Sequence, residues 1–179
     1  MNELVMLGVG ILLTVGTGIF VASEFSMLNL ERSDLEARRE RGERGLSNSI
    51  RALKKTSTHL SSAQLGITLT TMLTGFLAEP SLTVLLAPSI EAIGISAEFE
   101  GGVTLAISML LATLFSTLIG ELVPKKLALA IPLEVNKFVV GFQLVFSWVF
   151  TFMLKLLNAT GNGIVRSMGI EPKEELSST

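Results

Sequence analysis

The sequence predicts an all-α membrane protein, with three helices that span the bilayer and a further juxtamembrane helix in the plane of the membrane on its cytoplasmic side. Two observations carry this prediction. Hydrophobic residues make up 49% of the 179 residues and the mean hydropathy is +0.59, which is more apolar than a soluble domain of this size usually is. The apolar residues are also gathered into long runs, separated by stretches rich in charge.

Three of these runs have the length of a membrane-spanning helix, which needs about 20 apolar residues. The first covers about residues 4–30 and contains four glycines, which suit close helix packing in lipid. The second covers about residues 58–78, is rich in Ser and Thr, and is predicted to stop at Glu79-Pro80. The third covers about residues 102–128. Between the second and third, residues 80–98 are expected to form a short extracellular or re-entrant piece.

A fourth apolar run, at about residues 134–158, is predicted to lie in the membrane plane rather than cross the bilayer. Gln143 and Ser147 interrupt it, and it contains five of the ten Phe residues and the only Trp. Aromatic crowding of this kind is typical of the membrane interface. The alternative is a fourth spanning helix, which would carry Arg166 and Lys173 to the outside.

The distribution of Lys and Arg predicts the orientation of the chain. Eight of the fourteen lie between the first and second runs, in residues 31–56, so the positive-inside rule places this stretch in the cytoplasm and the N-terminus outside. Lys125 and Lys126 return the chain to the cytoplasm after the third run. We therefore expect a multi-pass protein of the cell membrane with a cytoplasmic C-terminus, in which residues 161–179 form a polar linker.

Residues 31–56 are expected to form short cytoplasmic helices. They mix charges of both signs, and Gly42 and Gly45 interrupt them. Glu40 and Arg44 have the i,i+4 spacing of a helical ion pair. For any single charged residue here, a solvated surface is the simpler interpretation.

Glu121 is the only ionisable residue between Val103 and Val123, inside the third run. A carboxylate in a membrane helix is costly unless a cation, a proton or a hydrogen-bond network compensates it. A structural carboxylate, protonated or paired with Lys125, is the alternative to a cation site. Lys125, however, lies near enough to the end of the run for its amine to reach the interface.

Prolines near Glu121 predict additional oxygen ligands. Pro124 has no amide, so the carbonyl of Gly120 loses its α-helical donor, and Pro132 has the same effect on Ala128. Ala128 is seven residues from Glu121, about two helical turns, and so lies on the same face. Freed carbonyls beside a carboxylate predict an oxygen-only cation site.

The other two runs supply hydroxyl groups. Ser23 and Ser26 are three residues apart and share one face of the first helix. Thr71 belongs to a series of Ser and Thr residues, with Gln64, in the second. A single hydroxyl in a membrane helix often bonds only to its own helix. The number of hydroxyls here nevertheless predicts a polar surface that faces other helices.

The absence of Cys and the presence of a single histidine, His59, exclude a zinc site of thiolates or several imidazoles within one chain. Oxygen ligands favour hard cations. One carboxylate is few for Ca²⁺, so the set suits Na⁺ or a largely dehydrated Mg²⁺, and composition does not separate these two.

Three segments of the chain together resemble the membrane domain of the CorC/CNNM family of magnesium transporters. They are Ser23-Glu24, Gln64-Leu-Gly-Ile-Thr-Leu-Thr-Thr-Met-Leu-Thr-Gly-Phe-Leu-Ala-Glu-Pro80 and Gly120-Glu-Leu-Val-Pro-Lys125. They occur in the family's order and spacing, so that residues 1–160 correspond to its transmembrane domain. The resemblance implies a homodimer that carries out Mg²⁺ efflux coupled to Na⁺ entry.

The resemblance also implies which residues bind Mg²⁺. They are Ser23 or Ser26 of the first helix, Thr71 of the second, and Glu121 of the third together with nearby carbonyls, for which Gly120 and Ala128 are the candidates. The family's nucleotide-binding CBS region would follow residue 179, so nucleotide binding is expected outside this sequence.

The sequence is therefore expected to be a Mg²⁺ transporter in contact with the lipid bilayer. The alternative is a Mg²⁺-sensing membrane subunit that regulates a separate transporter. An enzyme is not expected, because the sequence has no Ser/His pair, paired aspartates or His-Glu-x-x-His motif. Binding of nucleic acid is not expected either, since the net charge is −2.

Overall fold

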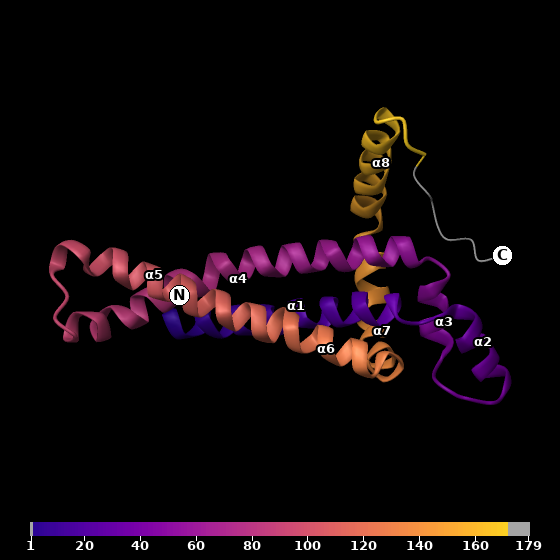
Figure 1. Cartoon of the computed structure of the whole chain (residues 1–179), viewed down its shortest axis with the longest axis horizontal. Helices are drawn as coiled ribbons and strands as arrows, with labels where there is room; N and C mark the ends of the chain where they lie inside the picture. Colours follow the sequence, from indigo (N-terminus) through magenta and orange to yellow (C-terminus); the bar gives the residue numbers. More distant parts are fainter. Residues whose placement is uncertain (1, 172–179) are drawn as a thin grey trace. The chain divides into compact units, whose positions relative to one another are not determined.

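The computed structural model describes residues 2–171, apart from the side chain of Ala97, and every regular element within them is helical. The elements, shown in Figure 1, are α1 (Glu3–Leu28), α2 (Arg32–Glu40), α3 (Ser47–Leu53), α4 (Thr56–Ala92), α5 (Ala97–Phe115), the π-helix η1 (Ser116–Leu122), α6 (Val123–Ala130), α7 (Pro132–Val149) and α8 (Thr151–Ser167). Three helical runs are long and apolar enough to span a membrane: Glu3–Leu28, Thr56–Ala92 and Glu98–Ala130. The predicted all-α fold with three candidate spans is thus confirmed.

The chain folds as two compact units that do not follow one another in sequence. Unit 1 takes in the chain up to Ile19 together with Ile67–Pro124. Unit 2 takes in Phe20–Gly66 and the chain from Lys125 onward. The three boundaries fall within α1, α4 and α6, so these helices contribute to both units.

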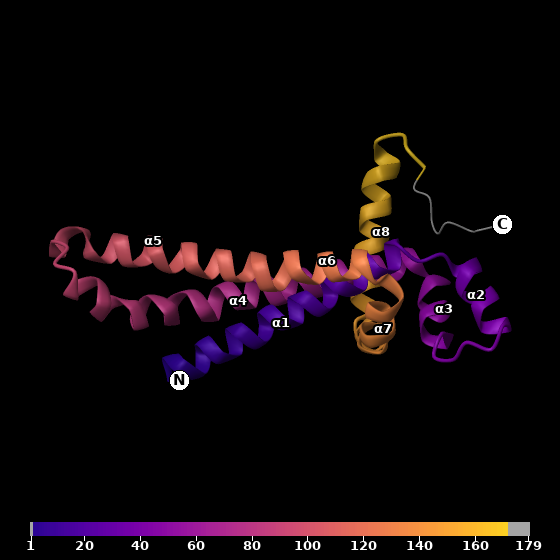
Figure 2. The ribbon, with the colours of Figure 1, turned by 60° about the horizontal axis from the view of Figure 1, so that its bottom comes forward.

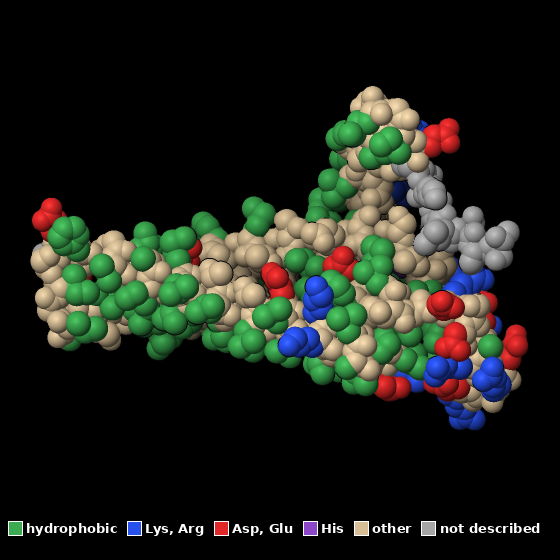
Figure 3. All heavy atoms as spheres, in the orientation of Figure 1, with side chains coloured by type: hydrophobic (Ala, Val, Ile, Leu, Met, Phe, Trp, Pro, Cys, Tyr) green, Lys and Arg blue, Asp and Glu red, His purple; other side chains and the backbone are tan. Residues whose placement is uncertain are grey.

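In unit 1, the later part of α4 runs antiparallel to α5 and η1, and the first part of α1 packs against α4 (Figures 1 and 2). The hydroxyls of Thr17 in α1 and Thr70 in α4 lie 2.8 Å apart and form a hydrogen bond. Hydrophobic side chains cover much of the visible surface of α4 and α5 (Figure 3). This surface is what a membrane-facing helical hairpin requires.

The second candidate span continues where the sequence analysis predicted a stop. α4 passes through Glu79-Pro80 and reaches Ala92, with Pro80 and Pro88 inside it. The expected separate piece at 80–98 is therefore mostly a continuation of α4. A proline removes one backbone bond and is tolerated in membrane helices. At about 1.5 Å per residue, the 37 residues of α4 exceed the roughly 30 Å hydrocarbon core.

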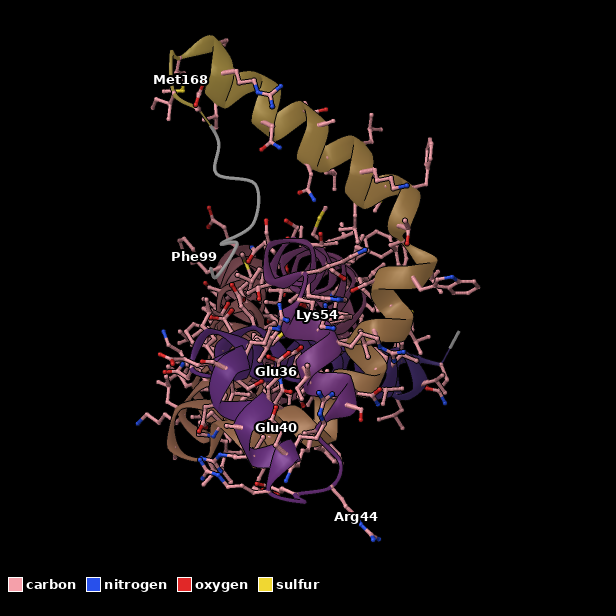
Figure 4. The ribbon with its side chains drawn as sticks, turned by 90° about the vertical axis from the view of Figure 1, so that its right-hand side faces the viewer. Glu36, Glu40, Arg44, Lys54, Phe99 and Met168 are labelled. Carbon is pink, nitrogen blue, oxygen red and sulfur yellow. The ribbon has the colours of Figure 1, made fainter. Side chains whose placement is uncertain are left out.

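In unit 2, α2 and α3 form a short helical hairpin around the buried side chains of Leu35, Leu46 and Ile50. The predicted short helices are therefore present, but the predicted Glu40–Arg44 pair is not helical, because α2 ends at Glu40. Figure 4 shows Glu36 and Glu40 on α2 and Arg44 on the loop after it.

The ion pairs of α2 lie about two turns earlier than the predicted pair. Arg32 bonds to Glu36 at 2.8 Å, and Arg38 bonds to Asp34 at 2.9 Å. The Glu36 carboxyl is only slightly buried. The hydrogen bond from Arg32 is the main reason why its pKa lies below the usual value. Charged side chains gather over α2 and α3 in Figure 3, as expected of a hairpin in water.

The fourth apolar run forms two helices rather than the single helix expected at about 134–158. α7 and α8 meet at Phe150 with a bend of 79°, and only the two together are long and apolar enough to span a membrane. Phe20, Phe142, Phe146 and Phe150 form an aromatic cluster, with Phe20 and Phe146 ring centroids 4.6 Å apart. Part of the aromatic crowding is thus explained by packing inside unit 2.

α8 extends to Ser167, into the range 161–179 that was expected to be a linker. The remainder of that expectation, residues 172–179, lies outside the described residues.

Candidate cation site

The third candidate span changes its helical geometry around Glu121. The residues of η1 form a π-helix, in which the amide of Val123 donates to the carbonyl of Leu118, five residues back rather than four. Single π-helical turns inside α-helices often occur at functional sites. The sequence analysis predicted a break at this position but not its form.

Pro124 and the π-helix together remove α-helical donors from the carbonyls of this stretch. The amide of Val123 is used by Leu118, and Pro124 has no amide, so the carbonyl of Ile119 has neither an α-helical nor a π-helical donor. The carbonyl of Gly120 lacks its α-helical donor, as the sequence predicted. The π-helix therefore adds Ile119 to the predicted carbonyl at Gly120.

A cavity of about 230 Å³ within unit 1 brings Thr71 of α4 and Glu121 of η1 together. Both side chains are exposed. Most of its lining residues carry a side-chain oxygen: Thr71, Thr74, Glu79, Thr113, Ser116, Thr117 and Glu121. Oxygen donors of this kind suit hard cations.

Glu79 is a lining residue that the sequence analysis did not assign to the site. It was placed beyond the end of the second span, because Glu79-Pro80 was expected to end the helix. Since α4 continues, Glu79 stays on the helix eight residues after Thr71, on the same side, and lines the cavity half-buried. The spacing of eight residues between Thr71 and Glu79 is the sequence feature that could have identified Glu79 as a lining residue.

Close packing of α1 supports the π-helical stretch within unit 1. A Cβ atom on Gly18 would lie 2.9 Å from Cγ of Pro124 and 3.3 Å from the carbonyl oxygen of Ile119. Gly120 is buried, and a Cβ there would lie 3.4 Å from Cγ2 of Thr14. The missing side chain of Gly18 therefore allows α1 to pack directly on the altered backbone.

The hydroxyls of unit 1 divide into two groups. Thr14 bonds to the carbonyl of Gly10 at 3.0 Å, and Ser108 bonds to the carbonyl of Thr104 at 2.8 Å, so bonding within the same helix does occur here. Within residues 2–171, Thr71 makes no such bond. Its hydroxyl is available to a ligand in the cavity.

Ser23 and Ser26 belong to unit 2, and both are fully buried. The Ser26 hydroxyl bonds to the carbonyl of Ser23 at 3.0 Å and accepts a hydrogen bond from Nδ2 of Asn136 in α7 at 3.1 Å. Within residues 2–171, the Ser23 hydroxyl and Oδ1 of Asn136 are buried without a hydrogen-bond partner. The sequence analysis did not select Asn136, because nothing local links it to Ser26.

Ala128 is buried in α6 of unit 2. α6 ends at Ala130, and Pro132 begins α7 instead of kinking a continuous helix. The carbonyl of Ala128 thus lies in the last turn of a helix, where carbonyls lack helical donors in any case. Of the predicted ligands, the structure brings Thr71 and Glu121 to one cavity, with Gly120 in the adjoining η1.

The described residues contain no cluster of three or more His, Cys, Asp or Glu side chains that could hold a metal ion. The cavity of unit 1 instead combines two carboxylates, several hydroxyls and an irregular backbone. Carboxylate, hydroxyl and carbonyl oxygens are the donor types that suit hard cations.

Comparison with known protein families places the chain in a family. Residues 8–179 match the family model for the Cyclin M transmembrane N-terminal domain, CNNM. The chain belongs to the CNNM family. The resemblance inferred from the three sequence segments is thereby confirmed, and a multi-pass membrane protein is the expected form of a CNNM domain with three candidate spans.

The CNNM chain is also similar to bacterial UPF0053 proteins. It is 44% identical to UPF0053 protein MT1890 of Mycobacterium tuberculosis over 166 residues, which cover 93% of this chain and 36% of that protein. It is 30% identical to UPF0053 protein YhdT of Bacillus subtilis over 175 residues, covering 97% of this chain and 37% of that protein. The chain therefore spans little more than a third of the length of these relatives.

Proposed function

We propose that this chain is the membrane domain of a Mg²⁺ transporter. CNNM family membership is consistent with a membrane role related to Mg²⁺ transport. The observation that carries the proposal is the cavity of unit 1, in which Glu121 and Thr71 share one space. Glu121 would supply the negative charge, and hydroxyls and freed carbonyls would replace part of the water around the ion.

In this proposal the protein supplies few ligands, as expected of a transport site that must release its ion. Mg²⁺ takes six oxygens at about 2.1 Å and gives up water reluctantly, so it would keep some water beside Glu121, Thr71 and the Gly120 carbonyl. Ser23 or Ser26 and the Ala128 carbonyl remain proposed ligands on the strength of the family resemblance. The unpartnered hydroxyl of Ser23 supports its inclusion.

We further propose that the direction is efflux, driven by Na⁺ entry through alternating access of the helices. Both points come from the family resemblance. The proposed orientation, with the N-terminus outside and residues 31–56 inside, is supported by the eight Lys and Arg residues in that stretch.

A homodimer is part of the proposal. Thr71 and Glu121 are exposed on two different candidate spans, and an ionised side chain at the centre of a membrane helix costs about 3 kcal/mol or more. A second copy that covered this face, and enclosed water and ions against it, would remove that cost.

The proposal is tested by reconstituting the purified chain into liposomes that contain a Mg²⁺-sensitive dye. We expect Mg²⁺ flux that depends on a Na⁺ gradient, and loss of that flux in Glu121→Gln. Glu98→Gln, which removes a carboxylate at the start of α5 outside the cavity, is the matched control and should transport normally.

Calorimetry of Mg²⁺ binding tests the Glu121 site directly and separates a transporter from a Mg²⁺-sensing subunit. Unchanged affinity in Glu121→Gln would refute the site. Normal Mg²⁺ binding by the unmodified chain, without flux under any Na⁺ gradient, would favour the Mg²⁺-sensing subunit instead.

A further inference from the structure

A second cavity, of about 630 Å³, lies wholly within unit 2 and has the opposite charge. Four cationic side chains line it: Arg51 of α3, Lys54 and Lys55 between α3 and α4, and Lys155 of α8. No Asp or Glu is among its lining residues in the described part of the chain. Lys54 is labelled in Figure 4, where α3 ends. Glu36 of α2 interacts electrostatically with Lys54 but does not line the cavity, so the lining keeps an excess of positive charge, which predicts an anionic ligand.

One face of α8 provides neutral hydrogen-bonding groups to the same cavity. Thr151, Lys155, Asn158 and Asn162 all line it and recur at intervals of three or four residues, so they share a face of the helix. The Thr151 hydroxyl already donates to backbone carbonyls of α7, so the donors that this face offers to phosphate oxygens are the Lys155 ammonium and the Asn158 amide. The cavity thus offers both charge and directional donors to a phosphate group.

The surroundings of the cavity favour a lipid over a soluble anion. Trp148 lines it and is 78% exposed, and Phe152 and Leu156, on a different side of α8, are 83% and 58% exposed. Lys55 directly precedes α4, a candidate membrane span. Exposed aromatic side chains next to Lys and Arg are typical of the level at which lipid headgroups lie.

We propose that this cavity binds the phosphate headgroup of an anionic phospholipid, with the acyl chains along the exposed apolar side chains of α7 and α8. The headgroup would join α3, the start of α4 and α8 through one shared anion. Basic pockets beside membrane helices are suited to such lipids. The inference does not depend on the ion that the protein transports.

The test is native mass spectrometry of the full chain in detergent micelles, titrated with phosphatidylglycerol or with phosphatidylcholine of the same acyl chains. We expect tighter binding of phosphatidylglycerol, because only this lipid has a net negative charge. The triple variant Lys54→Gln, Lys55→Gln, Lys155→Gln should lose this preference, at about fivefold in affinity for each charge removed.

A second triple variant, Arg39→Gln, Arg41→Gln, Arg44→Gln, is the matched control. It removes the same charge from exposed residues that do not line the cavity, and should keep the preference. Circular dichroism and size exclusion check that both triple variants fold. Lys155→Gln alone changes one exposed side chain of α8 and tests the lipid preference with less risk to the fold.

Two results would overturn the proposal. One is a preference for phosphatidylglycerol that survives in the cavity variant, or that is lost equally in the control. The other is displacement of the bound lipid by glycerol phosphate at equal concentration, which would make the ligand a soluble anion. Failure of either kind leaves the Mg²⁺ proposal untouched, because the cavity variant retains Glu121 and Thr71.

Discussion

The two units of this chain use the polar side chains of their apolar helices in different ways. In unit 2 these side chains bond to one another across helices. Ser147 of α7 lies within hydrogen-bond distance of Nδ1 of His59, at 2.9 Å, and of the Ser62 hydroxyl, at 2.8 Å. Gln143 donates to the carbonyl of His59 at 3.0 Å. Asn136 and Ser26 form a similar pair.

In unit 1 several polar side chains instead bond to their own helix or face a cavity, although the hydroxyl pair of Thr17 and Thr70 also joins two helices there. Ser108 illustrates the first behaviour, and Glu121, Glu79 and Thr71 illustrate the second. The difference separates two roles for polar groups in a membrane helix. In unit 2 most of them form hydrogen bonds that hold helices together, with the Ser23 hydroxyl as an exception, whereas in unit 1 several remain available to a ligand. Substitutions should therefore affect stability in unit 2 and ion binding in unit 1.

The largest effect is expected where the site of unit 1 depends on packing. Gly18→Val should destabilise the protein by about 3 kcal/mol and weaken Mg²⁺ binding, because its side chain would collide with Pro124 and the Ile119 carbonyl. Denaturation in mixed micelles and calorimetry would measure both. Gly8→Val is the control, since no atom lies within 4 Å of a Cβ at Gly8. Equal effects of the two variants would contradict this role of Gly18.

A smaller loss of stability is expected for the hydrogen-bond network of unit 2. Ser147→Ala should lower the free energy of unfolding by about 2 kcal/mol, because it leaves buried groups of His59 and Ser62 with fewer partners. Mg²⁺ affinity should not change. Ser108→Ala removes an equally buried hydroxyl that bonds only to its own helix, and should cost much less. A similar cost for both would remove the distinction between the units.

The reverse pattern is expected for the cavity of unit 1. Thr71→Val should weaken Mg²⁺ binding about tenfold, or about 1.4 kcal/mol, because one oxygen ligand is replaced by a methyl group. Thermal unfolding without Mg²⁺ should be unchanged. Thr83→Val, on α4 but outside the cavity, should bind Mg²⁺ normally. A marked drop in stability for Thr71→Val would assign this threonine to the fold instead.

The smallest effect concerns the ion pairs on the surface of α2. The bond from Arg32 lowers the pKa of Glu36, so its contribution to stability is complete above the usual carboxylate pKa and is lost as pH falls through the lowered value. Glu36→Gln should therefore be slightly less stable than the unmodified chain at pH 7 and equally stable in strong acid. High salt should reduce the difference at pH 7. A difference that persists in acid would point to another cause.

Much of the fold could be predicted because hydropathy and charge are local properties of the sequence. Apolar runs of the right length gave the three candidate spans, and the isolated carboxylate gave Glu121. Family-specific segments gave the CNNM membership. Each of these conclusions needs only residues that are close in the chain.

The tertiary structure decided the features that depend on neighbours distant in sequence. Pro80 is accommodated inside α4, which keeps Glu79 on the helix and in the cavity, and Pro124 follows a π-helix that packs against Gly18. Asn136 meets Ser26 across 110 residues. A proline fixes which backbone bond is lost, but packing determines whether the helix ends, widens or continues, and that packing is not a property of the local sequence.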